Sequence, residues 1–306
     1  MPCIPVDDAA DPRLAVYQQL NQQNPARWAG HFIAEGDKIA ERLIASRYPV
    51  QSLLLVPQYA ERFAALVPAE TPLYVGSRQL LEATIGFNFH RGVLACGRRL
   101  PPLSLAEAFG AGLAPTFGAG LPTPPKQPTA GLPADSEQTV PPGFSAGLPT
   151  PPKETSTVVV CPDLKDPTNL GSILRTSAAL GVSAVVLGPH CADHLSRRVV
   201  RVSMAAALQL PIVVAADVGG ALARLKHEFG CELVAAVVDP AAQPLAKARR
   251  PAKMALVLGG EAHGLPPELV RICDRRVTIP MQPGIDSLNV AVAAAVFLFH
   301  FCQQSS

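Results

Sequence analysis

A proline-rich repeat in the middle of the chain limits what this protein can fold into. Thirteen of its 32 prolines lie between residues 101 and 152, and the octapeptide AGLPTPPK at 119–126 recurs unchanged at 146–153. This composition buries too little apolar surface to offset chain entropy, and its prolines favour polyproline II. We expect a disordered linker over 103–155, with a PxxP-type docking site for an SH3-like partner as the alternative.

The composition outside the repeat is that of a folded protein with two domains. The chain has 306 residues, of which 48% are apolar, and its net charge is only +2. A nucleic-acid or membrane partner must therefore be recognised locally. The seven cysteines are scattered without a CxxC pair, which argues against a disulfide framework or a zinc site. Residues 1–12 lack a signal-peptide pattern, and no apolar run has membrane-spanning length, so we expect a cytoplasmic protein.

Residues 1–102 show the pattern of a small α/β/α domain. An amphipathic start and three helix-like segments are interspersed with three short apolar, strand-like runs. The amphipathic start is 14–23, the helix-like segments are 36–45, 59–66 and 78–83, and the strand-like runs are 51–56, 73–75 and 92–96. None of these segments has catalytic spacing.

Residues 156–306 alternate between apolar runs and helix-length segments. This pattern predicts parallel strands joined by crossover helices, and hence an open α/β sheet. The six predicted strands are 157–161, 184–187, 212–215, 233–238, 254–258 and 276–279. Open sheets of this kind bind ligands in the loops beyond the carboxyl ends of their strands, so polar residues in those loops are the candidates for chemistry.

The first such loop, 163–181, leads into a predicted helix. Pro167 suits the helix start and Gly181 its end, which puts Arg175 about one turn into the helix, beside Asn169 and Gly171. A surface arginine on a capped helix is the simpler alternative. The loop has no GxGxxG, so the nicotinamide fingerprint is absent.

Two further loops carry polar residues among glycines and prolines. After strand 254–258, Glu261 stands among Gly259, Gly260 and Gly264, which allow close backbone approach to a ligand or simply form a tight turn. His263 in this loop fits a solvated histidine better than a base. In the loop after strand 276–279, Ser287 and Asn289 precede an apolar helix. Ser287 could be only its N-cap, whereas Asn289 should lie inside the first turn and need another partner.

Together these loops resemble the SpoU/TrmH branch of the SPOUT RNA methyltransferases. The matching motifs are N-x-G-x-x-x-R at 169–175, G-x-E-x-x-G at 259–264, I-P-M at 279–281 and S-L-N-V at 287–290. The resemblance covers essentially all of 156–306, including a serine-containing loop at 198–211. With FIAEG at 32–36 and HRGVLA at 90–95, the first domain looks like the ribosomal-protein-L30e-like domain that often binds substrate in this family.

This resemblance implies a trefoil-knotted open parallel sheet, a homodimer, and a cofactor, S-adenosylmethionine, bound in the knot without any metal. It implies methyl transfer to a ribose 2′-hydroxyl in rRNA or tRNA. By position, the residues lining the cofactor pocket would be Gly259, Ile279, Met281 and Leu288. Those around the target ribose would be Asn169, Arg175, Glu261, Ser287 and Asn289. An inactive RNA-binding scaffold, base methylation, and an interaction protein acting through the proline repeat remain the alternatives.

The chain departs from the commonest family pattern at Gly260, Ala262 and Ala205, where Asn, Gly and Gly are frequent. RNA affinity must come from local basic clusters, although each such cluster is as often a solvated face. The candidates are Arg91, Arg98, Arg99, Arg197, Arg198, Arg201, Lys247, Arg249, Arg250 and Lys253. The loop 190–194, HCADH, mimics a metal cluster, but no further Cys or His stands near it in the sequence, and we expect no metal.

Overall fold

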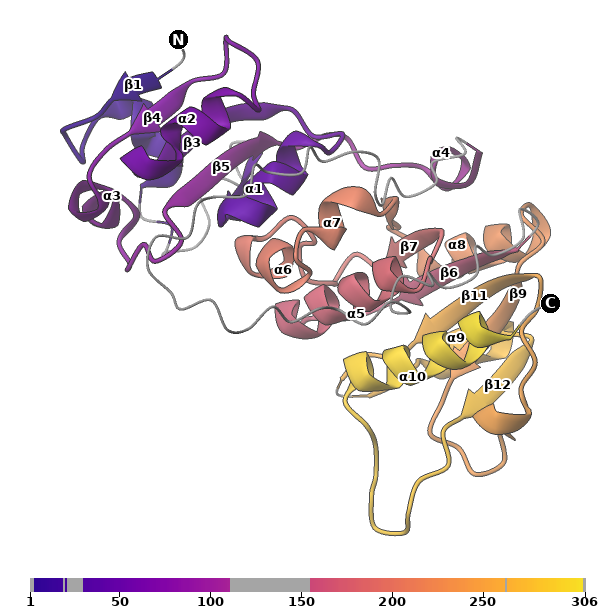
Figure 1. Ribbon diagram of the computed structural model, residues 1–306. Helices are drawn as coiled ribbons and strands as arrows, with labels where there is room; N and C mark the ends of the chain where they lie inside the picture. Colours follow the sequence, from indigo (N-terminus) through magenta and orange to yellow (C-terminus); the bar gives the residue numbers. More distant parts are fainter. Residues whose placement is uncertain (1–2, 19, 21–29, 111–154, 262, 305–306) are drawn as a thin grey trace, which may run out of the picture.

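The computed structural model of the chain contains two sheets that follow one another in the sequence (Figure 1). It describes residues 3–18, 20, 30–110, 155–261 and 263–304. The first sheet has five strands and is mixed, whereas the second has seven strands, all parallel. The chain therefore has the α/β architecture predicted for both halves of the sequence.

The first sheet has the strand order β1-β4-β3-β5-β2. Its strands are β1 (Cys3–Pro5), β2 (His31–Glu35), β3 (Val50–Leu55), β4 (Leu73–Val75) and β5 (Val93–Arg98). Helices α1 (Asp37–Ile44) and α2 (Ala60–Ala64) pack on one face through Ile39, Leu43 and Phe63. The short helix η1 (Pro12–Tyr17) and α3 (Arg78–Ile85) cover the other face, and η3 (Pro57–Tyr59) precedes α2.

The second sheet has the strand order β10-β12-β9-β11-β6-β7-β8. Its strands are β6 (Ser156–Cys161), β7 (Ala184–Leu187), β8 (Ile212–Val214), β9 (Glu232–Ala236), β10 (Gln243–Pro244), β11 (Lys253–Leu258) and β12 (Arg275–Thr278). Six of them match the predicted strands within two residues at each end. The central strands β11 and β6 consist almost entirely of buried apolar residues, as expected of parallel strands covered on both faces.

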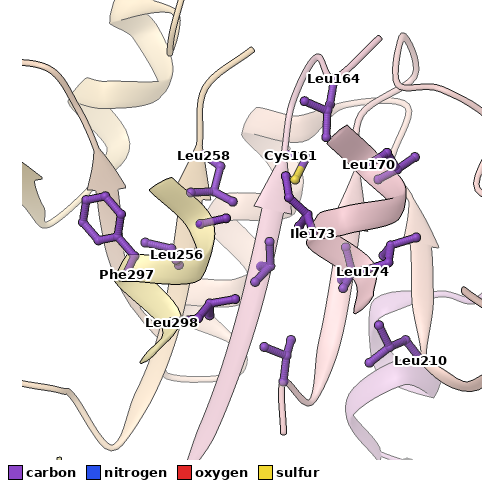
Figure 2. Close-up of a cluster of buried hydrophobic side chains, with 14 of the residues drawn as sticks. Cys161, Leu164, Leu170, Ile173, Leu174, Leu210, Leu256, Leu258, Phe297 and Leu298 are labelled. Atoms are coloured by element: carbon purple, nitrogen blue, oxygen red, sulfur yellow. The ribbon is translucent and has the colours of Figure 1, made fainter. Parts of the chain in front are cut away.

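Helices cover both faces of the second sheet. On one face lie α5 (Pro167–Ala179), α6 (Arg197–Val202), α7 (Ala206–Gln209) and α10 (Val290–Gln303), with η4 (Leu245–Lys247) at its edge. On the other lie α8 (Val218–His227), α9 (Pro267–Ile272) and α4 (Leu105–Gly110). Figure 2 shows the core of the first face, where Leu170 and Ile173 of α5 and Phe297 of α10 meet the strands. This packing fixes the starts of α5 and α10, which carry the polar motifs.

The two domains share an apolar and ionic interface. Leu195, Val200 and Leu208, which lie in or beside α6 and α7, belong to the same buried cluster as α1, β3 and β5 of the first domain. The Arg99 guanidinium is held by both carboxylate oxygens of Asp193, with Nη1 3.0 Å from Oδ1. The first domain thus rests directly on the helices beside α5.

Several elements differ from the sequence expectations. The strands β1, β2 and β10 were not among the predicted strands. Residues 105–110, inside the range expected to be linker, form α4, and Leu105 and Ala108 are buried against the second sheet. Residues 111–154, which hold most of the expected linker, lie outside the described residues. None of the helices described is long and apolar enough to span a membrane.

Candidate active site

The start of α5 lies directly after β6, at the carboxyl edge of the second sheet. The Asp166 carboxylate caps the helix by accepting the Thr168 N–H at 2.6 Å, and Pro167 occupies the first turn. Hydrogen bonds to the Asp166 carboxylate, first of all the one from the Thr168 N–H, hold its pKa below the ordinary value of an aspartate. Helix α5 therefore starts at a fixed point with Asn169 in its first turn.

A continuous chain of hydrogen bonds joins the three motif loops. Asn169 Nδ2 donates to Glu261 Oε1 at 3.0 Å, and Asn289 Nδ2 donates to Asn169 Oδ1, also at 3.0 Å. Glu261 Oε1 also accepts the Asp166 N–H at 3.3 Å. Residues 92 and 120 positions apart are thus brought together at the carboxyl edge of the sheet, where polar loop residues were expected.

Asn289 is the N-cap of α10, which corrects the expectation that it lies inside the first turn. Its Oδ1 accepts the N–H groups of Ala291 at 2.9 Å and Val292 at 3.3 Å. Ser287, expected as a possible N-cap, is exposed two residues before this cap. Because the Asn289 oxygen is occupied by the helix, its amide nitrogen must point outward, which sets the direction of the whole hydrogen-bond chain.

The loop after β11 is a tight glycine turn. Gly260 and Gly264 exchange two backbone hydrogen bonds of 3.1 Å, and Gly264 has a φ of +65°. A Cβ on Gly259 would lie 2.7 Å from the Gly264 Cα, and one on Gly260 would meet the Asp163 carbonyl oxygen. Glycine is therefore required by the packing of this turn against the β6 loop, and the turn holds Glu261 toward Asn169.

Arg175 lies farther from this chain than the sequence suggested. It is the ninth residue of α5, more than two turns from the helix start and about 9 Å along the axis from Asn169. Its side chain is exposed, and it makes no hydrogen bond or ion pair with the described residues. The expectation of a position one turn into the helix beside Asn169 is wrong, because six residues carry the chain well past one turn.

The remaining predicted residues lie around the loop between β12 and α10. Ile279 packs partly buried against the core beside β12, and Met281 is half-buried. Ser287 and Leu288 are exposed, and this segment extends away from the sheet in Figure 1. Within the described part of the chain, no hydrogen bond links Met281, Ser287 or Leu288 to the glycine turn. The structure therefore joins Asn169, Glu261 and Asn289 but leaves these loop residues apart from them.

Two residues hold this edge in place in a way the sequence did not predict: Arg198, expected only as a candidate for RNA binding, and Gly171, expected only as a motif glycine beside Asn169. Arg198 Nε of α6 donates to Thr168 Oγ1 at 3.0 Å, and Gly171 of α5 packs so closely that a Cβ would lie 2.7 Å from the Val202 Cβ. Both contacts bind α6 to the first turns of α5. The Asp–Pro pair at 166–167 was a readable capping signal, whereas the approach of α6 depends on tertiary packing.

Comparison with known proteins identifies the family. The model of the SpoU rRNA methylase family matches residues 156–299. A tRNA/rRNA methyltransferase of Mycobacterium bovis, described as uncharacterized, is 36% identical over 302 residues, which cover 96% of this chain and 90% of that protein. The chain belongs to the SpoU family of RNA methyltransferases. Its second domain is the SpoU domain, and the relative's coverage extends the likeness to the first domain.

Two other proteins resemble this SpoU-family chain over different lengths. A 23S rRNA (guanosine-2′-O-)-methyltransferase, RlmB, of Acinetobacter baylyi is 31% identical over 151 residues, or 49% of this chain and 61% of that protein. The crystal structure of an AdoMet-bound rRNA methyltransferase from Sinorhizobium meliloti superposes with a TM-score of 0.74 at 21% identity, covering 98% and 97% of the two chains. The second likeness is one of fold and includes both domains.

One departure from the commonest SpoU pattern has a structural counterpart. Ala205, where the family often has Gly, adopts a φ of +63° between α6 and α7, and Met204 before it has a φ of +51°. Glycine adopts such conformations without steric cost. This chain makes the left-handed bend with an alanine, whose side chain is fully buried at the domain interface.

Proposed function

We propose that this protein transfers a methyl group from S-adenosylmethionine to a ribose 2′-hydroxyl in rRNA or tRNA. The observation that carries the proposal is the hydrogen-bond chain from Glu261 through Asn169 to Asn289. It ties together the three SpoU motif loops at the carboxyl edge of a parallel sheet, where such folds bind ligands. The 2′-O activity named for the RlmB relative supports ribose as the acceptor.

The residues around β9 fit the cofactor. β9 lies between β11 and β12, so the glycine turn and the 279–288 loop flank its carboxyl end. Val238 just beyond β9 is 63% exposed and Leu288 is 38% exposed, which leaves apolar surface for an adenine ring between the two loops. Gly259, Ile279, Met281 and Leu288 would hold the cofactor there through backbone groups and apolar contact. When bound, it supplies a methyl group already activated on a sulfonium.

The polar residues of this chain have the remaining tasks: to align the ribose hydroxyl and to ease loss of its proton. Asn169, Ser287 and Asn289 supply neutral donors and acceptors for alignment, and Glu261 holds the loops together. A guanidinium is a poor base because it holds its proton throughout the physiological pH range, so Arg175 acts by binding phosphate and stabilising the developing oxyanion. No metal ion has a role in this mechanism.

The test uses labelled cofactor with unmodified total rRNA and tRNA. Wild-type protein is expected to leave label in alkali-resistant dinucleotides, and Arg175→Ala to lower the rate by about 100-fold or more, as loss of an oxyanion-stabilising donor does. The matched control is Arg224→Ala, since Arg224 is an exposed arginine on α8, paired with Glu228. If Arg175→Lys kept nearly the wild-type rate of methyl transfer, bidentate binding by the guanidinium would be contradicted.

Two other outcomes would replace the proposal. Label in ordinary mononucleotides would place the methyl group on a base. Absence of label, despite measurable S-adenosylmethionine binding, would favour an RNA-binding scaffold. Replacing residues 111–154 by a flexible linker leaves α4 in place and should leave methyl transfer intact. Loss of transfer would make the repeat part of the recognition surface.

The partner and the compartment follow from the same proposal. A line of exposed apolar side chains on α10, formed by Val292, Val296 and Phe299, supports a homodimer in which a second copy covers this face. All seven cysteines are free thiols, which fits the reducing cytoplasm. The trefoil knot implied by the family resemblance stays a prediction, as do the domain limits 1–102, 103–155 and 156–306.

A further inference from the structure

A cavity of about 290 Å³ lies between the two domains, beyond the carboxyl ends of β7 and β8. The first domain contributes Arg47 and Tyr48 from the α1–β3 connection and residues 99–102 after β5. The second contributes residues 187–189 and 191–195 after β7, together with Ile212 and Val214 of β8. Its size is at the small end of known ligand sites. The HCADH segment, to which the proposed reaction assigns no role, thus supplies most of one wall.

This wall is tied directly to the loop that leads into the candidate active site. Leu164 O accepts the Ala192 N–H at 2.7 Å, and Cys191 Sγ accepts the Leu164 N–H at 3.3 Å. Cys191 Sγ also donates to Cys161 O at 3.0 Å, as a protonated thiol can, and burial raises the pKa of this thiol. Because β7 pairs with β6, the cavity is one strand away from the start of α5 along the same sheet edge.

The first-domain wall presents a cation over a ring. The Arg47 guanidinium lies 5.0 Å from the centroid of the buried Tyr48 ring and donates to its hydroxyl at 3.2 Å. The Arg47 side chain is exposed and lines the cavity, so its guanidinium is accessible to a ligand. Arginine planes and aromatic rings are the surfaces on which proteins stack unpaired bases.

The second-domain wall presents a neutral histidine. Its neighbours Asp193 and Arg99 are fixed to one another by two hydrogen bonds. Burial, with help from the cations Arg99 and Arg47, lowers the pKa of His194 to about 4, although Asp193 acts in the opposite direction. The ring is therefore neutral near pH 7, with one donor and one acceptor nitrogen. Neither nitrogen is hydrogen-bonded to any residue that the structure describes.

We propose that this interdomain cavity binds one unpaired nucleotide of the RNA substrate, next to the nucleotide that is methylated. Arg47 stacks on the base or pairs with its phosphate, and His194 hydrogen-bonds the base edge. Val214, 40% exposed, and Leu100 at the mouth supply apolar contact for the base. The inference rests on the proposed function for the identity of the polymer, but the cavity itself makes no use of the cofactor loops.

Ligand-observed NMR on the full-length protein tests the cavity without any methyl transfer. The probes are AMP, GMP, CMP, UMP and inorganic phosphate, each titrated separately, and saturation transfer to the base protons reports contact with the base. Wild-type protein is expected to bind at least one nucleotide through its base. Arg47→Gln and His194→Phe should weaken that affinity at least fivefold, and His194→Gln, which restores a donor and an acceptor, should recover part of it. Arg224→Gln is the charge-matched control and should bind as wild type does.

Three results would overturn the proposal: no nucleotide binding by wild type, binding that Arg47→Gln and His194→Phe leave unchanged, or inorganic phosphate binding as tightly as the nucleotides without base contact. The last result would make the cavity a simple anion site. The two cavity variants also distinguish nucleotide binding in the cavity from binding at the glycine turn. The affinity of an adenine at the glycine turn should not change in Arg47→Gln or His194→Phe.

A second measurement distinguishes this inference from the proposed function. In the labelled-cofactor assay, Arg47→Gln and His194→Phe should raise KM for RNA at least fivefold with kcat near the wild-type value. Nucleotide binding without any methyl transfer to RNA by wild type would sink the proposed function and leave a nucleotide site. Transfer with wild-type KM in both variants would sink the cavity inference alone.

Discussion

Asn289 has two separable tasks at the level of single atoms. Its Oδ1 caps α10 by accepting two backbone N–H groups, while its Nδ2 donates to Asn169 and so bridges two loops. Aspartate is as good an N-cap as asparagine but has no donor. Replacing the one residue by the other therefore isolates the bridge from the cap.

Asn289→Asp is expected to keep the free energy of unfolding within about 0.5 kcal/mol of wild type, because the cap survives. The variant has two carboxylates around the Asn169 amide, the new one and that of Glu261. In either orientation of the amide, its oxygen faces one of these carboxylates and loses its hydrogen-bond donor. We expect methyl transfer to fall about tenfold, the effect of one lost hydrogen bond of ordinary strength. Asn289→Ala should lose the same activity and also about 1 kcal/mol of stability in urea unfolding.

If Asn289→Asp transferred methyl groups at the wild-type rate, the hydrogen bond between the two loops would not matter for the reaction. A stability loss as large as that of Asn289→Ala would show that the cap has not been preserved, and the comparison between the two variants detects this directly.

The sequence predicted that five polar side chains surround one site, and the structure joins three of them by hydrogen bonds while Arg175 and Ser287 lie apart. Asn169, Glu261 and Asn289 each stand within a few residues of a strand or helix end, and the parallel sheet brings those ends together. Arg175 was misplaced although the predicted helix start at Pro167 was right, because the ninth residue of α5 lies more than two turns past that start and not one. Asn289 lies two residues nearer the start of α10 than a cap at Ser287 would put it, because the motif alone does not show which of the two residues caps the helix.

At the scale of elements, the glycine turn after β11 brings two backbone segments into direct contact, Gly259 on one side and Gly264 and Leu265 on the other. Gly259→Ala is expected to displace it, since the new Cβ would lie 2.7 Å from the Gly264 Cα and 2.7 Å from the Leu265 nitrogen. The expected cost is about 1–3 kcal/mol of stability, as for overpacking elsewhere, with S-adenosylmethionine binding weakened at least tenfold. Calorimetric titration and urea unfolding measure the two effects.

Gly219→Ala is the matched control, because its nearest neighbour would be 3.4 Å away, the Asp217 side chain, and it lies within α8. It should bind the cofactor normally and be as stable as wild type or up to about 1 kcal/mol more stable, since alanine favours helices. Equal cofactor affinity in Gly259→Ala would remove this turn from the binding site.

The loop between β7 and α6 gives the protein a pH-dependent stability. Because the pKa of His194 is about 4 in the folded protein and about 6.5 unfolded, the unfolded chain takes up the proton first as the pH falls. Stability should therefore decrease between pH 6.5 and pH 4. Asp193, whose pKa is also lowered, loses its contribution only below its ordinary value near 4.

Urea unfolding at pH 7.5 and pH 5.0 measures this slope. The difference between the urea midpoints at the two pH values should be smaller for His194→Gln than for wild type. If the difference in urea midpoint between pH 7.5 and pH 5.0 were the same in both proteins, His194 would already be protonated in the folded protein at pH 5.0.

The elements missed from the sequence have a common physical reason. β1 and β10 have only three and two residues, and each pairs along one edge of its sheet, so neither has a readable apolar period. The apolar run of β2 was read only as part of a family motif. Helix α4 was assigned to the linker because it directly follows two prolines, yet Leu105 and Ala108 find partners on the second sheet that local composition cannot reveal.

At the scale of the whole molecule, the first domain contacts α6, the α6–α7 bend and the loop that precedes α6. Arg42 of α1 donates to the carbonyl of Met204, and Glu35 of β2 lies 3.7 Å from the Arg201 guanidinium. Helix α6 in turn contacts the first turns of α5 through Arg198 and Val202. Three of the basic residues predicted to bind RNA, Arg99, Arg197 and Arg201, are thus engaged at the domain interface.

The exposed face of α10 makes the final prediction, on the assembly. Val292, Val296 and Phe299 are 52%, 40% and 59% exposed and stand four and three residues apart, so they form one stripe along the helix. A charge in this stripe would be desolvated in a dimer but solvated in a monomer. Val296→Glu should therefore convert a wild-type dimer to a monomer in light scattering, with an unchanged circular dichroism spectrum. Val214→Glu, at an equally exposed valine on β8, should remain dimeric; a monomeric wild type, or a dimeric Val296→Glu, would exclude this face as the interface.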